Sequence, residues 1–295
     1  MSIEDINTFA GCRSVLVIDE TDDTTFPMVV LYPTSKPESS IHFEEHDLDA
    51  SVNAAPRQGV FPLVLISHGS GGSPLLYRTL ALYLARHGFI VGVPEHPFNN
   101  RDNNSLEGTV ENLLNRPRHI RTVIDWFFGR MEFARILKPG AVAVIGHSLG
   151  GYTALAVAGG VPYTVKEAAG PGHKLHVTHD PRVQALVLLA PAASWFRNEG
   201  ALSGVNVPIL LLVGDKDKHT PREVHVQPIL KGVPDKTKIE YRVVENAGHF
   251  SFLSPYPSHM VNAAFPPSQD PPGFDRALFH ERLNVEVLEF LRRVL

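Results

Sequence analysis

The sequence has almost no cysteine. Cys12 is the only one among 295 residues, so an intramolecular disulfide is impossible and a metal cluster held by thiolates is excluded. A chain of this length can bury a large core, so it needs neither disulfides nor a metal to hold it together. With 43% hydrophobic and 20% charged residues, its composition is that of a globular protein rather than a disordered one.

Long apolar runs and basic runs are also missing. No segment approaches the roughly eighteen uninterrupted apolar residues that a membrane-spanning helix needs. Residues 1–5 do not form a basic start leading into an apolar stretch, so we expect no secretory leader and a cytoplasmic location. The formal net charge is −4, and without a basic run nucleic acid is not an expected partner.

The sequence does contain a regular succession of apolar runs bounded by turn residues. Several runs are nearly continuous in Val, Ile and Leu, which is typical of parallel strands covered by helices on both faces. The expected strands are Val15–Ile18, Met28–Tyr32, Leu63–Ser67, Phe89–Val93, Val142–Ile145, Ala185–Leu189, Ile209–Val213 and Ile239–Val244. We expect the first two to pair antiparallel at a sheet edge.

Segments with helical spacing lie between these runs and after them. They are Leu75–His87, Glu111–Phe128, Leu149–Ala158, Glu223–Leu230 and Arg276–Val294, the last with an apolar face of Leu278, Leu283, Val287, Leu288 and Leu291. The alternation predicts the α/β class, as one domain over residues 1–295 with a mostly parallel, doubly wound sheet flanked by helices. Residues 33–59, 159–182 and 254–275 are too long for simple connections and are candidate lid or pocket-rim insertions.

One short motif follows an expected strand directly. Gly146-His147-Ser148-Leu149-Gly150 lies between the strand ending at Ile145 and a helix of small residues. Gly-x-Ser-x-Gly at such a junction places the serine at the apex of a sharp turn, where a side chain on either flanking glycine would clash. The motif predicts Ser148 as a nucleophile, with the helix N-terminus facing the reacting centre.

A serine hydroxyl needs a base, and a neutral imidazole needs an acid to fix its tautomer. His249 follows the strand ending at Val244 and is the expected general base. Asp215 and Asp217 both follow the strand ending at Val213 and compete for the role of acid. Asp217 is favoured, because its position in the turn lets it reach back toward His249. The order Ser, Asp, His at successive strand ends matches the way such sites are built.

An oxyanion hole needs two backbone N–H groups. One is expected from Leu149, directly after the nucleophile. The other should come from the loop after an earlier strand, and Leu63–Ser67 runs into His68-Gly69-Ser70-Gly71-Gly72. Ser70 is the predicted second donor.

These segments resemble known α/β-hydrolases. Phe61–Gly69, Tyr77, Leu84–Val91 and Glu95-His96 are similar to the branch of platelet-activating-factor acetylhydrolases and dienelactone hydrolases. Val207–Ile209, Asp217–Pro221 and Asn246–Phe250 also resemble cutinase-like polyester hydrolases. The similarity runs from Arg13 to the C-terminal helix, apart from the three insertions. It implies the α/β-hydrolase fold and cleavage of a carboxylic ester through an acyl-serine intermediate, without a cofactor or metal.

One departure from the acetylhydrolases bears on the substrate. Their acid follows the strand that corresponds to Ala185–Leu189, where this chain has Ala190-Pro191-Ala192. The acid here matches the cutinase-like position, Asp217, which weakens the inference of a phospholipid substrate. The resemblance makes Trp195 the candidate for an aromatic residue that flanks the substrate, and Phe250 is a further candidate.

Other polar residues have less specific interpretations. His173, His176 and His179 have even spacing, but no helical register brings them onto one face, so rim or solvent-facing histidines are expected rather than a metal site. His96 could line the pocket or be a structural histidine with satisfied hydrogen bonds. Arg116, Arg118 and Arg121 are expected to form a solvated helix face.

The sequence thus predicts a serine hydrolase acting on a carboxylic ester or lactone. Two alternatives stay open. The same site could perform acyl transfer, cyclisation or a lyase-type reaction in a biosynthetic pathway. A non-catalytic binding protein on this fold is disfavoured, because all three triad residues are present.

Overall fold

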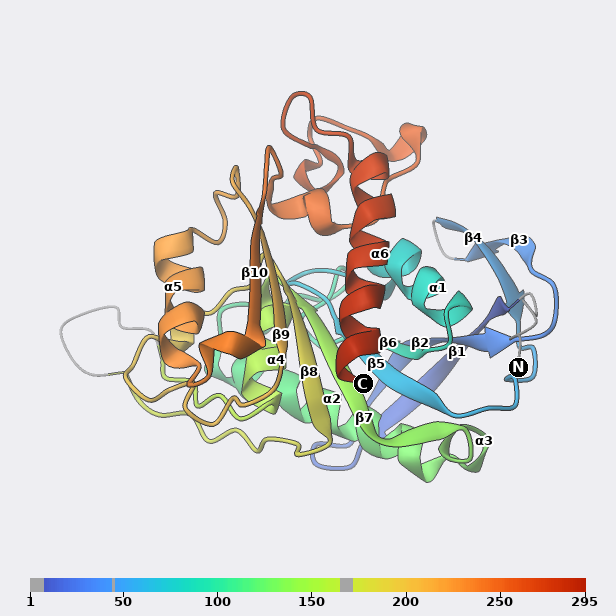
Figure 1. Cartoon of the computed structure of the whole chain (residues 1–295), viewed down its shortest axis with the longest axis horizontal. Helices are drawn as coiled ribbons and strands as arrows, with labels where there is room; N and C mark the ends of the chain where they lie inside the picture. Colours follow the sequence, from blue (N-terminus) through green and yellow to red (C-terminus); the bar gives the residue numbers. More distant parts are fainter. Residues whose placement is uncertain (1–7, 44–45, 165–171) are drawn as a thin grey trace.

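A computed structural model describes residues 8–43, 46–164 and 172–295 of the chain. Ten strands form one continuous sheet in the order β10-β9-β8-β7-β5-β6-β2-β1-β4-β3 (Figure 1). The strands are β1 (Phe9–Asp19), β2 (Thr24–Thr34), β3 (Ser39–Phe43), β4 (His46–Val52), β5 (Phe61–Ser67), β6 (Ile90–Pro94), β7 (Leu137–His147), β8 (Val183–Leu189), β9 (Ile209–Gly214) and β10 (Ile239–Val244). All eight strands expected from the sequence are present among them.

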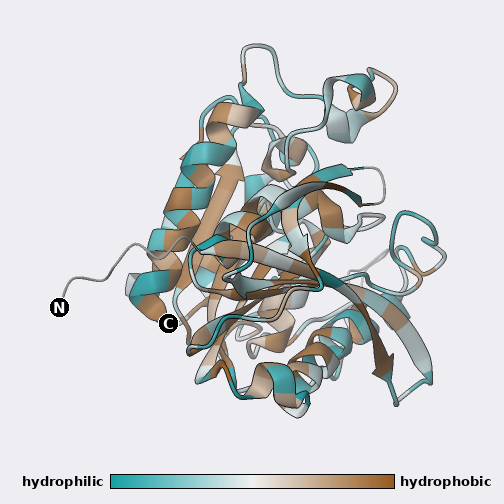
Figure 2. Cartoon of the chain, turned by 90° about the vertical axis from the view of Figure 1, so that its right-hand side faces the viewer, coloured by the Kyte–Doolittle hydropathy of each residue, from teal (hydrophilic) through white to brown (hydrophobic). Residues whose placement is uncertain are grey.

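Six neighbouring strands, from β10 to β6, run parallel. Their residues alternate between two apolar clusters: Leu63 and Leu65 face one side of the sheet, whereas Val64 and Ile66 face the other. In Figure 2 these central strands are mostly brown, whereas the helices alternate teal and brown. The nearly continuous apolar runs therefore arise because both faces of the sheet are buried.

Helices cover both faces. The helices are α1 (Arg78–Arg86), α2 (Val110–Gly129), α3 (Met131–Ala134), α4 (Leu149–Val157), α5 (Arg222–Gly232) and α6 (Arg276–Val294). Helices α2, α4 and α5 pack on one face and α1 and α6 on the other. This is the predicted doubly wound arrangement. On α6, Leu283, Val287, Leu288 and Leu291 are buried as expected, but Leu278 is 44% exposed and Phe279 packs in its place.

The N-terminal third differs from the expectation. Strands β1 and β2 pair antiparallel as predicted, but they do not form the sheet edge, because β4 pairs with β1 and β3 pairs with β4. The described part of the segment 33–59, a candidate lid, therefore extends the sheet. Short polar strands with weak apolar patterning give little signal in a sequence. One sheet spanning the described chain supports the single-domain organisation, which stays a prediction.

Candidate active site

Ser148 lies at the turn between β7 and α4 in a strained conformation, with φ of 54° and ψ of −119°. The turn is possible only with glycine on both sides. A Cβ added to Gly146 would lie 2.1 Å from the carbonyl oxygen of Gly150, and one added to Gly150 would lie 1.9 Å from that of Ser67. The structure thus gives the steric reason for both glycines of the motif.

Asp217 and His249 meet beyond the ends of β9 and β10. Asp217 Oδ2 lies 2.8 Å from His249 Nδ1, and both side chains are almost fully buried. Asp217 Oδ1 also accepts hydrogen bonds from the backbone N–H groups of His219 and Thr220, and Oδ2 accepts one from Thr220 Oγ1. These contacts fix the carboxylate so that it orients the imidazole.

The Asp217 carboxyl is held in its charged form. Burial alone would raise its pKa, but the hydrogen bonds from His249 and Thr220 and the nearby imidazole charge outweigh burial and hold the pKa well below the usual range. Asp215, the competing residue, instead lies 3.5 Å from the ammonium of Lys216 and is a third exposed. The structure brings Asp217, not Asp215, to His249.

Ser148 and His249 line the same cavity. In the described part of the chain the Ser148 hydroxyl forms no hydrogen bond with His249. Such bonds between nucleophile and base are often long before substrate binds and tighten in the complex. The arrangement therefore allows His249 to remove the proton of Ser148 once a substrate occupies the cavity.

The backbone N–H groups of Ser70 and Leu149 are both free to donate to a ligand. Neither has an acceptor in the described protein. The carbonyl of Ser148 accepts from Gly151 N–H at 2.9 Å and from Ala192 N–H at 2.8 Å. A peptide unit is planar and trans, so the N–H of Leu149 in the same unit points the opposite way.

The loop that carries Ser70 also has a peptide carbonyl held by hydrogen bonds on the side away from the cavity. The carbonyl of Gly69 accepts from His68 Nδ1 at 2.7 Å and from Gly72 N–H at 3.1 Å. The other ring nitrogen of His68 accepts from His96 N–H at 3.0 Å, so Nδ1 carries the proton. With its carbonyl held from behind, the Gly69–Ser70 peptide directs the N–H of Ser70 the other way. An oxyanion hole requires two backbone N–H groups that are held in place and free to donate, as these two are.

A second histidine, which the sequence did not single out as functional, links these parts. His147 Nε2 donates to the backbone carbonyl of His249 at 3.0 Å, and its Nδ1 lies 3.0 Å from the Tyr77 hydroxyl. Burial, followed by the nearby charge of His249, lowers the pKa of His147 to about 3, so the ring is neutral. The Tyr77 hydroxyl also accepts from Gly69 N–H at 3.3 Å. His147, the residue between the glycine and the serine of the motif, thus ties the loop of His249 to the turn of Ser148.

The site opens into a cavity of about 550 Å³. Trp195 and Phe250, the two predicted substrate contacts, both line it. Trp195 packs edge-on against Tyr152, with ring centroids 5.1 Å apart, and Phe250 packs edge-on against His249 at 5.2 Å. Other apolar lining residues are Leu76, Leu113, Leu253, Tyr256, Met260 and Phe265. The cavity suits an apolar or aromatic group next to the reacting carbon.

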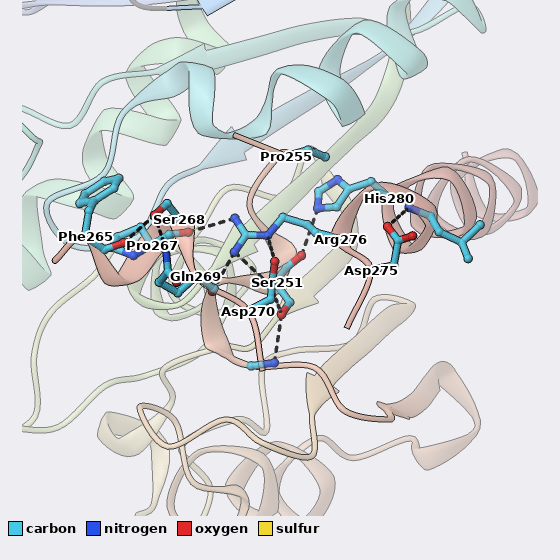
Figure 3. A network of polar contacts seen from close by, with 12 residues as sticks. Ser251, Pro255, Phe265, Pro267, Ser268, Gln269, Asp270, Asp275, Arg276 and His280 are labelled. Carbon is cyan, nitrogen blue, oxygen red and sulfur yellow. Dashed lines mark hydrogen bonds and ion pairs between the residues drawn. The ribbon is translucent and has the colours of Figure 1, made fainter. Parts of the chain in front are cut away.

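The segment 254–275 forms one wall of this cavity, through Tyr256, Met260, Phe265 and Pro267. Figure 3 shows what holds it in place. Arg276, at the start of α6, binds Asp270 through Nε and Nη2 at 2.8 and 3.1 Å and also donates to the carbonyls of Pro267 and Gln269. Asp270 accepts from Ser251 Oγ at 2.7 Å, two residues after His249. The wall is therefore held both to α6 and to the loop that carries His249.

The other candidate insertions contribute less. The segment 33–59 supplies His46 to the cavity, and no described residue of 159–182 lines it; residues 44–45 and 165–171 of these two segments lie outside the described residues. His173, His176 and His179 are exposed, and among the described residues no group of three or more His, Cys, Asp or Glu is placed to hold a metal. No helix in the described ranges is long and apolar enough to cross a membrane.

The expectation of a solvated arginine face on α2 was wrong for Arg116, which is fully buried. His96 is the structural histidine of the two alternatives: it is fully buried and lies 2.8 Å from Ser67 Oγ through Nε2. Arg116, His68 and His119 join it in a buried polar cluster behind the Ser70 loop. Nothing in the local sequence distinguishes these side chains from surface ones.

Comparisons with known proteins find chains that are similar in sequence and in fold. A family model described as chlorophyllase matches residues 48–167, which is less than half of the chain. A bis(hydroxyethyl) terephthalate hydrolase from Streptomyces coelicolor is 26% identical over 193 residues, covering 65% of this chain and 52% of that protein. Cutinase est1 of Thermobifida alba is 24% identical over 199 residues, covering 66% and 56%. The chain thus spans about half the length of these curated relatives.

A solved structure of a ferulic acid esterase from Streptomyces cinnamoneus superposes with a TM-score of 0.68 at 18% identity, covering 100% of this chain and 92% of the other. Likeness at this identity concerns the fold. The predicted resemblance to cutinase-like polyester hydrolases is confirmed by the two sequence relatives. The chain has the α/β-hydrolase fold and is similar to bacterial cutinase-like ester hydrolases.

Proposed function

We propose that this protein hydrolyses a carboxylic ester, with Ser148 as nucleophile, His249 as general base and Asp217 orienting the base. The observation that carries the proposal is the buried contact between Asp217 and His249, 2.8 Å long, at the cavity that Ser148 lines. The relatives named bis(hydroxyethyl) terephthalate hydrolase and cutinase support it.

The chemistry follows from the groups present. The ester carbonyl oxygen binds between the N–H groups of Ser70 and Leu149. Ser148 Oγ attacks the carbonyl carbon while His249 takes its proton, and the tetrahedral intermediate collapses when His249 returns that proton to the leaving alcohol. Water, deprotonated by His249, then attacks the acyl-serine and releases the acid. Asp217 stabilises the imidazolium in both half-reactions and stays ionised.

The cavity indicates the kind of ester. Its wall of aromatic and aliphatic side chains favours an acyl group that is apolar or aromatic, flanked by Trp195 and Phe250. The charged lining groups, Arg101 and Glu107, are a minority. We therefore propose a small neutral ester as substrate and no nucleic acid partner. The cytoplasmic location stays a prediction, which cell fractionation would test.

The first experiment is labelling with a fluorophosphonate probe, with the modified residue mapped by mass spectrometry. We expect Ser148 to be labelled in the wild type and labelling to collapse in His249→Ala. The kcat of Ser148→Ala on p-nitrophenyl butyrate should fall by several orders of magnitude, to the residual level that the oxyanion hole and binding alone supply. Full activity in Ser148→Ala would refute the proposed mechanism.

A further inference from the structure

Arg116 carries a buried positive charge close to the active site. Its side chain is fully buried, and all of its hydrogen-bond acceptors are neutral. Nη1 donates to Asn99 Oδ1 at 2.6 Å, Nη2 to Ser67 Oγ at 3.3 Å and to the carbonyl of His68, and Nε to Thr153 Oγ1 at 3.1 Å. Among the described residues it forms no ion pair. Burying an unpaired charge is costly, so its presence here calls for a role.

The guanidinium reaches the loop that carries Ser70 by two routes. It holds the His68 carbonyl directly, and the N–H of Gly69 at the other end of that peptide donates to Tyr77. Asn99 accepts from Arg116 and donates through Nδ2 to Ser70 Oγ at 3.0 Å. The peptide next to the Ser70 amide and the Ser70 side chain therefore both depend on Arg116.

It also reaches the other donor. Thr153 accepts from Arg116 and donates to the carbonyl of Leu149 at 3.1 Å, in the first turn of α4. A planar guanidinium offers five donors in a fixed fork. One side chain thus spans the two loops that present the two N–H groups of the oxyanion hole.

The surroundings leave the charge of Arg116 available. Burial, reinforced by the charge of Arg116, lowers the pKa of His68 to about 3 and lowers that of His96 far below the usual value, so both rings are neutral. Burial lowers the pKa of Arg116 itself to about 9, which leaves it charged at neutral pH. The carboxylate connected to this network, Glu107, accepts from Ser70 Oγ at the exposed end. In a dry interior an uncompensated charge acts over a longer distance than in water.

We propose that Arg116 is a positioning residue for the oxyanion hole, which fixes the loops of Ser70 and Leu149 relative to each other and places a positive charge behind them. Negative charge forms on the substrate oxygen only during the reaction, so this interaction is stronger in the transition state than in the ground state. The inference rests on the proposed ester hydrolysis at Ser148.

The test compares Arg116→Lys and Arg116→Gln with Arg118→Gln, a control on the same helix whose side chain pairs with Asp19. On p-nitrophenyl acetate we expect kcat to fall about 100-fold in Arg116→Gln and about tenfold in Arg116→Lys, as when an oxyanion donor is lost. KM should change less than about threefold. The Ki of a phenyl-substituted trifluoromethyl ketone, which forms a tetrahedral adduct, should rise in parallel with the loss of kcat/KM. Arg118→Gln should leave kcat unchanged.

A second variant covers the case in which Arg116 variants do not fold. Asn99→Asp is nearly isosteric, supplies a carboxylate that neutralises Arg116, and removes the donor to Ser70 Oγ and Asn104 Oδ1. If Arg116 were needed only for stability, it would keep or strengthen its contact with residue 99 in this variant, and kcat would not change. We expect kcat to fall at least about tenfold with the melting temperature unchanged or higher.

The two proposals fail in different ways. If the wild type shows no fluorophosphonate labelling at Ser148, the proposed function is wrong. If the wild type is labelled and active but Asn99→Asp and folded Arg116 variants keep wild-type kcat and wild-type Ki for the ketone, Arg116 is only a structural residue and this inference is overturned.

Discussion

Two arginines are buried beside the same cavity and are held in opposite ways. Arg276 meets the carboxylate of Asp270 with two of its nitrogens and gives further hydrogen bonds to backbone carbonyls. Arg116 has only neutral acceptors. The charge of Arg276 is neutralised by Asp270, so this side chain serves to hold the cavity wall in place. The charge of Arg116 is not neutralised, so its electric field extends to the surrounding groups. Burial alone therefore does not define the role of a charged residue; its partners do.

The sharpest way to separate the two is to remove the charge of each. Arg276→Met should leave kcat on a small ester such as p-nitrophenyl acetate within about threefold of wild type, against the roughly 100-fold loss expected without the Arg116 charge. For a bulky ester, which uses the wall of Tyr256 and Phe265, KM should rise in Arg276→Met. Steady-state kinetics on the two esters checks this. A large fall in kcat on the small ester would remove the distinction between the arginines.

The second prediction turns Arg276 into a residue like Arg116. Asp270→Asn removes the carboxylate and leaves a buried guanidinium with neutral partners. We expect the free energy of unfolding to fall by about 2 kcal/mol, below the figure for fully buried pairs because Asp270 is partly exposed. Urea denaturation followed by circular dichroism measures it, with Asp49→Asn, an exposed residue, as control. An unchanged midpoint would mean that the wall is not fastened by this pair.

The third prediction concerns pH. On the Arg116 side burial lowers the pKa of His68 and His119 from 6.5 to about 3. Between these values the unfolded chain binds more protons than the folded one, so stability is highest above pH 6.5 and falls as pH drops toward 3. Each such histidine contributes a slope of about 1.4 kcal/mol per pH unit in that window. His119→Gln should flatten the slope measured by urea denaturation at a series of pH values, and an unchanged slope would contradict a neutral cluster.

The smallest effect on the free energy of unfolding is expected for Tyr256, whose ring lies next to Arg276. The Tyr256 hydroxyl is buried without a hydrogen-bond partner in the described protein, and the guanidinium of Arg276 lies 5.6 Å from its ring centroid. Tyr256→Phe keeps the ring, so the free energy of unfolding should change by less than about 0.5 kcal/mol. Thermal denaturation checks this. A loss above 1 kcal/mol, on the order of a net hydrogen bond, would reveal a contact of the hydroxyl.

Much of the site could be predicted because the residues that define it lie in short segments of the sequence. The glycines around Ser148 are needed within the turn itself, and Asp217 and His249 each follow a recognisable buried strand. The strand order then brings the three ends together. The glycines of the motif give the position of the turn. The position of Asp217 in the loop after its strand favours it over Asp215.

The remaining parts depend on contacts between distant segments. The acceptors of Arg116 come from residues 17 to 49 positions away, so a helix with three arginines resembles a solvated face. Strands β3 and β4 are short and polar, and only the pairing of β4 with β1 makes them part of the sheet. Leu278 and Phe279 are neighbours, and which one packs inward depends on the rotation of α6 against α1. None of these outcomes follows from composition or periodicity.

The wall segment is anchored by hydrogen bonds near both of its ends. At the start, Ser254 forms hydrogen bonds with Leu76 and Thr79; at the end, Asp270 binds Ser251 and Arg276. The lining residues Tyr256, Met260 and Phe265 fall between these anchors. The stretch between the two anchors can therefore vary in length and in its side chains without disturbing the triad, so that it can be replaced as a unit. Related proteins could diverge in substrate range at this one place, and an engineer could graft a new binding surface there.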